Sequence, residues 1–384
     1  MTLPDQITVK KFQPLFLCLK DIGPFQEKTY IVDLTDAKGE GCNIFLLLSK
    51  NGNGKTTILR TFFQLMHCLL PPDERELALS TIQGRFKSGQ AQLDICVELT
   101  CNMVSSIFIL SLMMGKEIDG KITPLKAWQE SELDQYNTTV RKTLLLDENP
   151  RQWINADKRD PLKVLRQAIA VRSGDIGNTV SFMDSLDILP SVLWLSTQRS
   201  IDRIADDRPI SQPECWGYRL AYDVSGDAGQ WNQSLDNLLV WMKWLDDGTL
   251  ERTTGLVNDY LFKGSNKFLE GVRKTPPEAI VSSDGHKHRL DQLSSGEQSL
   301  VQMLLRIGAH MTQNSIILID ELELHLHPNW QHKILNILKR IVRDHPGLTI
   351  IASTHSREIL GAFPLDIQEK GVRKGGDILH AGFC

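Results

Sequence analysis

A buried strand that leads directly into a glycine-rich loop constrains this chain more than any other feature. The run Cys42-Asn-Ile-Phe-Leu-Leu-Leu48 is almost entirely apolar, which is typical of a strand covered on both faces of a sheet. It is followed by Ser49-Lys-Asn-Gly-Asn-Gly-Lys-Thr-Thr57 and by helical spacing over Thr56–Leu70. Strand, glycine loop and helix together form the arrangement that binds phosphate through backbone N–H groups. The sequence therefore predicts an α/β fold with a phosphate-binding loop.

The residues of this loop have distinct expected roles. The backbone is expected to turn toward the phosphates over Asn51, Gly52, Asn53 and Gly54, and over Lys55, Thr56 and Thr57 at the start of the helix. Lys55 is expected to reach the β- and γ-phosphates of ATP, and the Thr56 hydroxyl to ligate Mg²⁺. The usual pattern begins with Gly, whereas Ser49 stands there in this chain. A plain glycine-rich turn is the alternative, but it leaves the intact Gly-Lys-Thr unexplained.

A second buried strand, Ile316–Ile319, ends in two acids. Ligands of open α/β sheets collect at the carboxyl ends of strands, so Asp320 and Glu321 are expected to face the nucleotide. We expect Asp320 to bind Mg²⁺ and Glu321 to be the general base for the attacking water. The alternative is that both acids cap the next helix, but that helix is predicted to begin only at Pro328.

Two further motifs are also suited to contact the phosphates of a nucleotide. Ser294, Ser295 and Gly296 precede a predicted helix over Glu297–His310, whose N–H groups are suited to an anion, although Ser294 also suits an ordinary helix cap. Because the phosphate loop already holds the chain's own nucleotide, we expect this spare site to serve a nucleotide held by a second copy. His355, just beyond the predicted strand Leu348–Ser353, is expected to contact the γ-phosphate or the attacking water.

The remaining pattern predicts a parallel core sheet covered by helices, with antiparallel strands beside it. Asp284-Gly285 between two short predicted strands predicts a β-hairpin. The predicted strands are Gln6–Val9, Leu15–Lys20, Tyr30–Leu34, Asn43–Leu48, Ala91–Leu99, Ser105–Leu112, Ser191–Leu195, Ala279–Ser282, His286–Leu290, Ser315–Ile319 and Leu348–Ser353. The other predicted helices are Ile154–Ala170, Gln230–Leu245, Leu250–Phe262 and Pro328–Asp344.

Bulk properties narrow the class of protein. The 384 residues have a formal net charge of −4, so any contact with DNA would have to come from a local basic patch. Seven cysteines are scattered without a Cys-x-x-Cys pair, which favours reduced thiols. No signal-peptide pattern and no apolar run long enough for a bilayer are evident, so a cytoplasmic protein that does not enter the membrane is expected. No cysteine or further histidine lies near His325 and His327 in the sequence to complete a metal site. A loop that contacts a second subunit is therefore expected there.

Taken together, the motifs resemble the ABC-type ATPase head of the SMC, RecF and OLD groups. Asp320-Glu-Leu-Glu-Leu-His-Leu-His-Pro328 is similar to the Asp-Glu-Pro-Glu-x-x-Leu-His-Pro form of the OLD-like and RecF-like branch, with Leu322 in place of Pro. Thr354-His-Ser356 matches the switch motif of that branch. The resemblance implies a P-loop NTPase with an ABC-type head, ATP and Mg²⁺ as ligands, and a glutamine that senses Mg²⁺. Gln198 in Ser196-Thr-Gln-Arg199 is the best match for that glutamine, and Gln83 and Gln90 are weaker candidates.

The resemblance also suggests an organisation and a function. Residues 1–115 would form the first part of the head and 267–384 the second part. The helical patterning of 116–266 predicts a mostly helical insertion, which the resemblance does not cover apart from a core strand near 192–200. ATPases of this type that lack the TOPRIM nuclease domain occur in anti-phage systems such as Septu and PARIS. This implies an ATP-driven switch or sensor that forms a homodimer or higher homo-oligomer and controls a separate effector, such as a nuclease.

Two other functions are compatible with some of these motifs. The first is a RecF-like or SMC-like clamp that binds DNA in repair or recombination; a transporter subunit is the second, and the Leu-His-Pro form argues against it. Basic groups between 151 and 166 are the candidates for a DNA contact, although interleaved acids favour a solvated helix face. They are Arg151, Lys158, Arg159, Lys163 and Arg166. Steep salt dependence of duplex binding would favour the clamp.

Overall fold

The computed structural model describes most of the chain and contains three sheets. The described residues are 7–26, 28–70, 89–115, 141–146, 160–174, 189–199, 201, 209–224 and 230–379, with only the backbone described at 141–146 and 274. The largest sheet has six strands in the order β14-β3-β13-β12-β7-β8, and every neighbouring pair is parallel. They are β3 (Ile44–Leu48), β7 (Val192–Leu195), β8 (Ala221–Asp223), β12 (Ile316–Ile319), β13 (Thr349–Thr354) and β14 (Lys374–Ile378).

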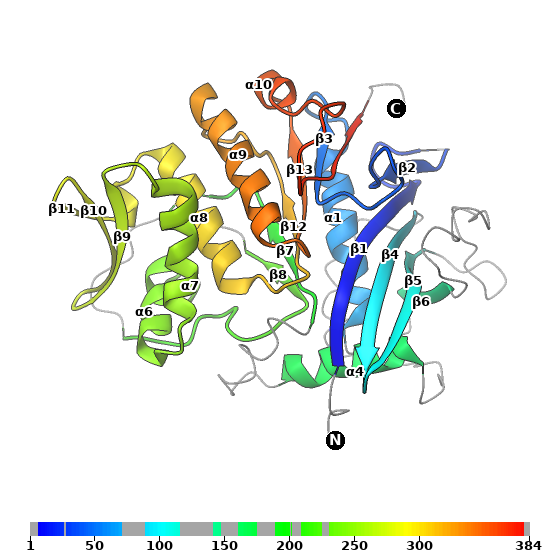
Figure 1. The fold of residues 1–384 in the computed structure, drawn as a ribbon, viewed down its shortest axis with the longest axis horizontal. Coiled ribbons are helices and arrows are strands. Elements are labelled where there is room, and N and C mark those ends of the chain that lie inside the picture. Colours follow the sequence, from blue (N-terminus) through cyan, green and yellow to red (C-terminus); the bar gives the residue numbers. More distant parts are fainter. Residues whose placement is uncertain are drawn as a thin grey trace.

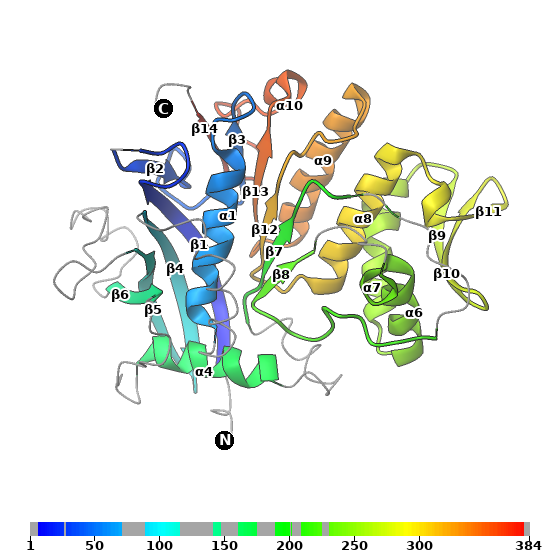
Figure 2. The same cartoon turned by 180° about the vertical axis from the view of Figure 1, so that it is seen from behind.

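Helices cover both faces of this core sheet. The helix α1 (Lys55–Met66) lies on one face, and α8 (Ser295–His310) and α9 (Pro328–Asp344) lie on the other (Figure 1, and from behind in Figure 2). Successive side chains of β12 alternate between the two hydrophobic cores, with Leu318 on the α1 side and Ile319 on the α8 side. This two-sided burial is the reason that the strand reads as a continuous apolar run.

A second, five-stranded sheet packs beside α1, in the order β2-β1-β4-β5-β6. It consists of β1 (Ile7–Lys20), β2 (Tyr30–Asp33), β4 (Gln90–Cys101), β5 (Val104–Met114) and β6 (Arg141–Leu146). The sequence predicts two strands within β1, but the structure has one, with irregularities between Val9 and Lys11 and between Pro14 and Phe16. Proline lacks an N–H donor and is tolerated at a bulge, so Pro14 interrupts the pairing without ending the strand.

The third sheet stands at one end of the molecule with two short helices (Figure 1). Its strands are β9 (Lys267–Lys274), β10 (Pro277–Ser283) and β11 (His286–Arg289), and the helices are α6 (Leu235–Leu245) and α7 (Thr249–Leu256). Ser283 pairs with His286, so Asp284 and Gly285 form a two-residue turn, with φ of 50° and 80°. Positive φ at both positions is the geometry that the Asp-Gly signal predicts.

The middle of the chain contributes to both larger sheets. It supplies β6 to the five-stranded sheet and β7 and β8 to the core sheet, and a π-helix at Val257–Phe262 follows α7. The predicted helix Ile154–Ala170 is found as α4 (Pro161–Gly174); residues 151–159 lie outside the described part of the chain. Asp160 caps its start by accepting a hydrogen bond from the Leu162 N–H at 3.1 Å. The divisions at 115/116 and 266/267 remain predictions.

The basic residues considered for a DNA contact are only partly within the described residues. Arg151, Lys158 and Arg159 lie outside them, and Arg166 is 9% exposed, so it has little surface to offer a nucleic acid. Separately, none of the helices in the described ranges has the length and apolar character needed to cross a bilayer.

Candidate active site

The phosphate loop joins the end of β3 to the start of α1, as the sequence predicts. Gly52 and Gly54 have φ of 89° and 91°, in the left-handed region where glycine is favoured. A Cβ added at Gly54 would lie 2.6 Å from Pro24 Cγ and 2.7 Å from Phe25 Cζ, so this position also excludes a side chain sterically. Ser49 is not among the described residues with positive φ. The absence of the usual first glycine therefore requires no strained backbone.

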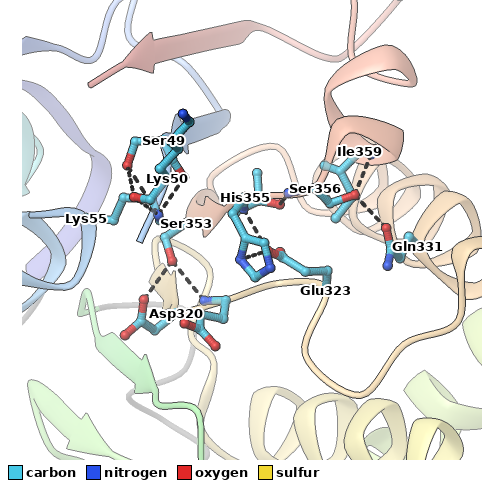
Figure 3. Close-up of polar contacts among 12 residues, drawn as sticks. Ser49, Lys50, Lys55, Asp320, Glu323, Gln331, Ser353, His355, Ser356 and Ile359 are labelled. Atoms are coloured by element: carbon cyan, nitrogen blue, oxygen red, sulfur yellow. Dashed lines mark hydrogen bonds and ion pairs between the residues drawn. The ribbon is translucent and has the colours of Figure 1, made fainter. Parts of the chain in front are cut away.

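Lys55 is the buried cation of this loop. It is 6% exposed, and its ammonium donates to the carbonyl oxygens of Ser49 at 2.7 Å and Lys50 at 3.0 Å (Figure 3). Burial lowers the pKa of Lys55, and the nearby acids at the end of β12 oppose that shift. Neutral carbonyls hold the ammonium less strongly than phosphate oxygens do, so Lys55 is placed to exchange them for a nucleotide.

The residues predicted to bind Mg²⁺ meet in space, apart from Gln198. The Thr56 hydroxyl donates to Asp320 Oδ2 at 2.8 Å, although the two residues are 264 positions apart. The Ser353 hydroxyl donates to the other oxygen, Oδ1, at 2.6 Å, and Asp320 is 4% exposed. A threonine hydroxyl and one carboxylate fit Mg²⁺, which usually takes few protein ligands and completes its shell with water and phosphate oxygens. These residues would hold the ion beside the phosphate loop.

Glu321 leaves the strand in an unusual backbone conformation. Its φ is 50°, and its N–H donates to the Ser353 hydroxyl at 2.8 Å. The side chain is partly exposed, and no hydrogen bond to its carboxylate is found within the described residues. A carboxylate without such a bond, next to the residues predicted to bind Mg²⁺, is available to accept a proton from water, as the proposed base must.

His355 is held by a residue to which the sequence analysis assigned no role. Glu323 Oε1 accepts a hydrogen bond from the His355 backbone N–H at 2.6 Å and lies 2.6 Å from the ring Nδ1 (Figure 3). Glu323 is 7% exposed, whereas the His355 side chain is 46% exposed. His355 also lines a hollow of about 750 Å³ together with Ser49, Asn51 and Asn53 of the phosphate loop. His355 therefore borders the same hollow as the phosphate loop, and the contacts with Glu323 fix its orientation.

Gln198 is placed less favourably than the resemblance implies. It is exposed and lines a separate hollow of about 280 Å³ with Arg306 and His310, and no contact joins it to Thr56 or Asp320 within the described residues. Its neighbour Arg199 is 4% exposed and donates to the Asp320 carbonyl oxygen. Burial lowers the pKa of Arg199 to about 10, while the three nearby acids oppose that shift. The assignment of Gln198 as a Mg²⁺ sensor therefore remains a prediction.

The serines before α8 form a well-made helix start. The Ser294 hydroxyl accepts from the Glu297 N–H at 3.4 Å, and Glu297 accepts in return from the Ser294 N–H at 3.3 Å. Burial would raise the pKa of Glu297, but hydrogen bonds from Lys267 and Ser294 outweigh it and lower that pKa. Ser295 is exposed. Ser294 is therefore an N-cap, and Ser295 and Gly296 present the first turn to solvent.

These serines and the phosphate loop belong to different layers of the molecule. Figures 1 and 2 show α8 and α1 on opposite faces of the core sheet. A Cβ on Gly296 would lie 3.4 Å from the His325 carbonyl oxygen. The segment Ser294–Gly296, here called the serine turn, therefore packs beside the loop 322–328 and not beside the phosphate loop. His325 has a φ of 62°, and both His325 and His327 are exposed. Within the described residues, no hydrogen bond or ion pair joins Ser294, Ser295 or Gly296 to the phosphate loop.

A phosphate loop, an acidic strand end and a serine turn on the opposite layer of one parallel sheet are the parts that the sequence resemblance to ABC-type P-loop ATPases implies. Comparison with known proteins finds similarity to ATPases over part of the chain. The family model described as "AAA domain, putative AbiEii toxin, Type IV TA system" matches residues 248–361. That range includes the serine turn, Asp320, Glu321 and His355, whereas the phosphate loop precedes it.

Curated relatives match a similar fraction of the chain. The Retron Ec83 probable ATPase of Escherichia coli is 30% identical over 146 residues, which is 34% of this chain and 25% of that protein. The Septu protein PtuA of Bacillus thuringiensis is 30% identical over 124 residues, 29% of this chain and 31% of that protein. The matches thus span about a quarter to a third of these relatives' length. Among solved structures, the SMC head domain from Thermotoga maritima aligns with 91% of this chain and 92% of its own, with 12% identity and a TM-score of 0.39.

Proposed function

We propose that this chain is an ATP-hydrolysing switch that controls a separate effector protein, such as a nuclease, in prokaryotic anti-phage defence. The observation that carries the ATPase part is the contact of Thr56 with Asp320, which joins the phosphate loop to the acidic strand end. The similarity to a Septu protein and to retron ATPases supports the defence role, because Septu is one of the anti-phage systems that the sequence resemblance indicates.

The described residues suggest how the reaction proceeds. Lys55 leaves the carbonyl oxygens of Ser49 and Lys50 and binds the β- and γ-phosphates. Bound Mg²⁺ would neutralise part of the phosphate charge. Glu321 takes a proton from water while the water oxygen bonds to the γ-phosphorus and the bond to the β–γ bridging oxygen breaks. ADP and phosphate are the products.

The position of the serine turn, Ser294–Gly296, supports a shared nucleotide. Ser295 and Gly296 present N–H groups at the positive end of α8, on the layer of the sheet opposite α1. A second copy in a two-fold arrangement would bring its own turn against the nucleotide of the first, and the reverse. ATP would then hold the two copies together, and hydrolysis would separate them. An effector that binds one of these two states would respond to the bound nucleotide.

Phosphate release by the purified chain tests this function. We expect hydrolysis of ATP that requires Mg²⁺, is absent in EDTA, and rises per chain with protein concentration because two copies complete each site. A co-expressed partner nuclease should co-purify with the chain, and its activity should change between ATP and ADP. Absence of Mg²⁺-dependent hydrolysis at any concentration would contradict the ATPase role, while duplex binding with a steep salt dependence and no partner would favour the DNA clamp.

A further inference from the structure

Glu323 and His355 form a carboxylate–histidine pair at the ends of adjacent parallel strands. Glu323 lies in the turn after β12, and His355 follows β13, its neighbour in the core sheet. One oxygen, Glu323 Oε1, accepts from the His355 N–H at 2.6 Å and contacts ring Nδ1 at the same distance. Two contacts from a buried oxygen fix both the backbone and the ring of the histidine (Figure 3). The ring therefore has a defined orientation before any nucleotide binds.

This contact decides where the ring proton lies. A carboxylate only accepts hydrogen bonds, so the nitrogen next to it must carry the hydrogen, and in a neutral imidazole the other nitrogen is then an acceptor. We infer that Glu323 is a positioning residue that holds the proton of the neutral His355 ring on Nδ1 and leaves Nε2 to accept a hydrogen bond from the attacking water. The inference rests on the proposed ATPase function. It also decides between the two partners expected for His355 in favour of the attacking water, because an unprotonated Nε2 cannot donate a hydrogen bond to a phosphate oxygen.

The surroundings of Glu323 suit this task. The side chain is 7% exposed, and its second oxygen, Oε2, is buried without a hydrogen-bond partner within the described residues. A buried carboxylate with a spare oxygen is unfavourable for folding, so a cap for the His355 N–H alone would be better made by a neutral group. Lys55 and Arg199 both lie close enough to interact with the charges of Glu323 and Asp320. These cations offset the buried charge.

The same turn also orients the proposed base. The Glu321 N–H donates to the Ser353 hydroxyl at 2.8 Å, and the Leu322 N–H donates to the Ser353 carbonyl at 2.9 Å. Glu321 and Glu323 are therefore both tied to the end of β13, the first through Ser353 and the second through His355. A water held by Nε2 of His355 would therefore lie close to Glu321, the proposed base, because the turn after β12 carries both Glu321 and Glu323.

Histidine ¹⁵N spectra of the nucleotide-free protein test the proton position directly. At about pH 8.5, roughly two units above the ordinary histidine pKa, we expect a protonated Nδ1 and an unprotonated Nε2 for His355. The resonances are assigned by their loss in His355→Asn. A proton on Nε2, either alone or on both nitrogens, would overturn the inference. Because no nucleotide is present, this result is separate from whether the protein hydrolyses ATP.

Two substitutions at Glu323 test the consequence. Glu323→Leu removes the acceptor at similar volume, so we expect the Nδ1 tautomer to be lost and kcat to fall about 10- to 100-fold, with KM for ATP nearly unchanged. Glu323→Gln retains one acceptor oxygen, so the tautomer should persist and kcat should fall less. Equal losses in both variants with an unaltered tautomer would overturn the positioning role. The circular dichroism and melting temperature of each variant show whether it folds.

Discussion

Glu321→Gln binds ATP with nearly parental affinity and hydrolyses it about 10²- to 10⁴-fold more slowly, because an amide cannot accept the proton of the attacking water. The substitution keeps the size of the side chain and its exposed position, and the backbone at φ of 50° treats the two residues alike. ATP that cannot be cleaved should hold two copies together. Phosphate release at saturating ATP gives the rate, and size-exclusion chromatography with ATP and Mg²⁺ gives the population of the closed assembly.

Glu251→Gln is the matched control for this variant. Glu251 is an exposed residue of α7, in a helix outside the site, and the substitution makes the same chemical change. We expect parental hydrolysis and no accumulation of the assembly. If Glu321→Gln instead turns over ATP within a few-fold of the parental rate, Glu321 is not the base, and Asp320 or a water bound to the metal becomes the candidate.

Ser294→Arg should abolish hydrolysis while leaving ATP binding to a single chain nearly intact. A bulky cation at the start of α8 blocks the turn that we propose to meet a partner's γ-phosphate, yet it lies on the layer opposite the chain's own phosphate loop. The measurement pairs phosphate release with calorimetric titration of a non-hydrolysable ATP analogue at protein concentrations low enough to keep chains apart. We expect a loss of at least about 10²-fold in rate, comparable to removal of a transition-state donor.

A second variant separates this effect from loss of the helix cap. Ser294 accepts the Glu297 N–H, and removing such a cap destabilises a helix by about 1 kcal/mol. Ser294→Asn retains an N-cap side chain of moderate size, so it should melt near the parental temperature and keep more of the activity than the arginine variant. Weakened analogue binding by isolated Ser294→Arg chains would instead place this serine in the chain's own pocket.

The sequence predicted the parts of the site that local patterns define. Gly54 and Lys55 are recognisable because the dihedral angles and the helix start that they require are local. The meeting of Thr56 and Asp320 was also predictable, because parallel strands bring their carboxyl ends to one edge of a sheet. The hairpin at Asp284 was correct for a similar reason, since two residues determine the turn.

The residues that were missed depend on non-local geometry. Glu323 stands in an alternating Leu-Glu-Leu-His run that carries no sign of its partner, and its contact with His355 follows from the pairing of β12 with β13. Likewise, the turn after β7 directs Arg199, rather than Gln198, toward Asp320. A sequence motif locates such a residue with an uncertainty of about one position. Adjacent residues of an extended segment point in opposite directions, so that uncertainty decides which side chain reaches the site. The continuity of β1 through Pro14 was missed because a bulge has no clear sequence signal.

Mixing two inactive variants tests the shared nucleotide most directly. Lys55→Ala lacks the ammonium that we propose binds the phosphates, and Ser294→Arg blocks the serine turn. If each site combines the loop of one copy with the turn of the other, a mixed pair contains one intact site. We predict negligible hydrolysis by either variant alone and recovery of about a quarter of the parental rate in an equal mixture, as random pairing into two-fold dimers requires. A mixture no more active than the sum of its parts, or full activity of chains kept strictly monomeric, would contradict the account.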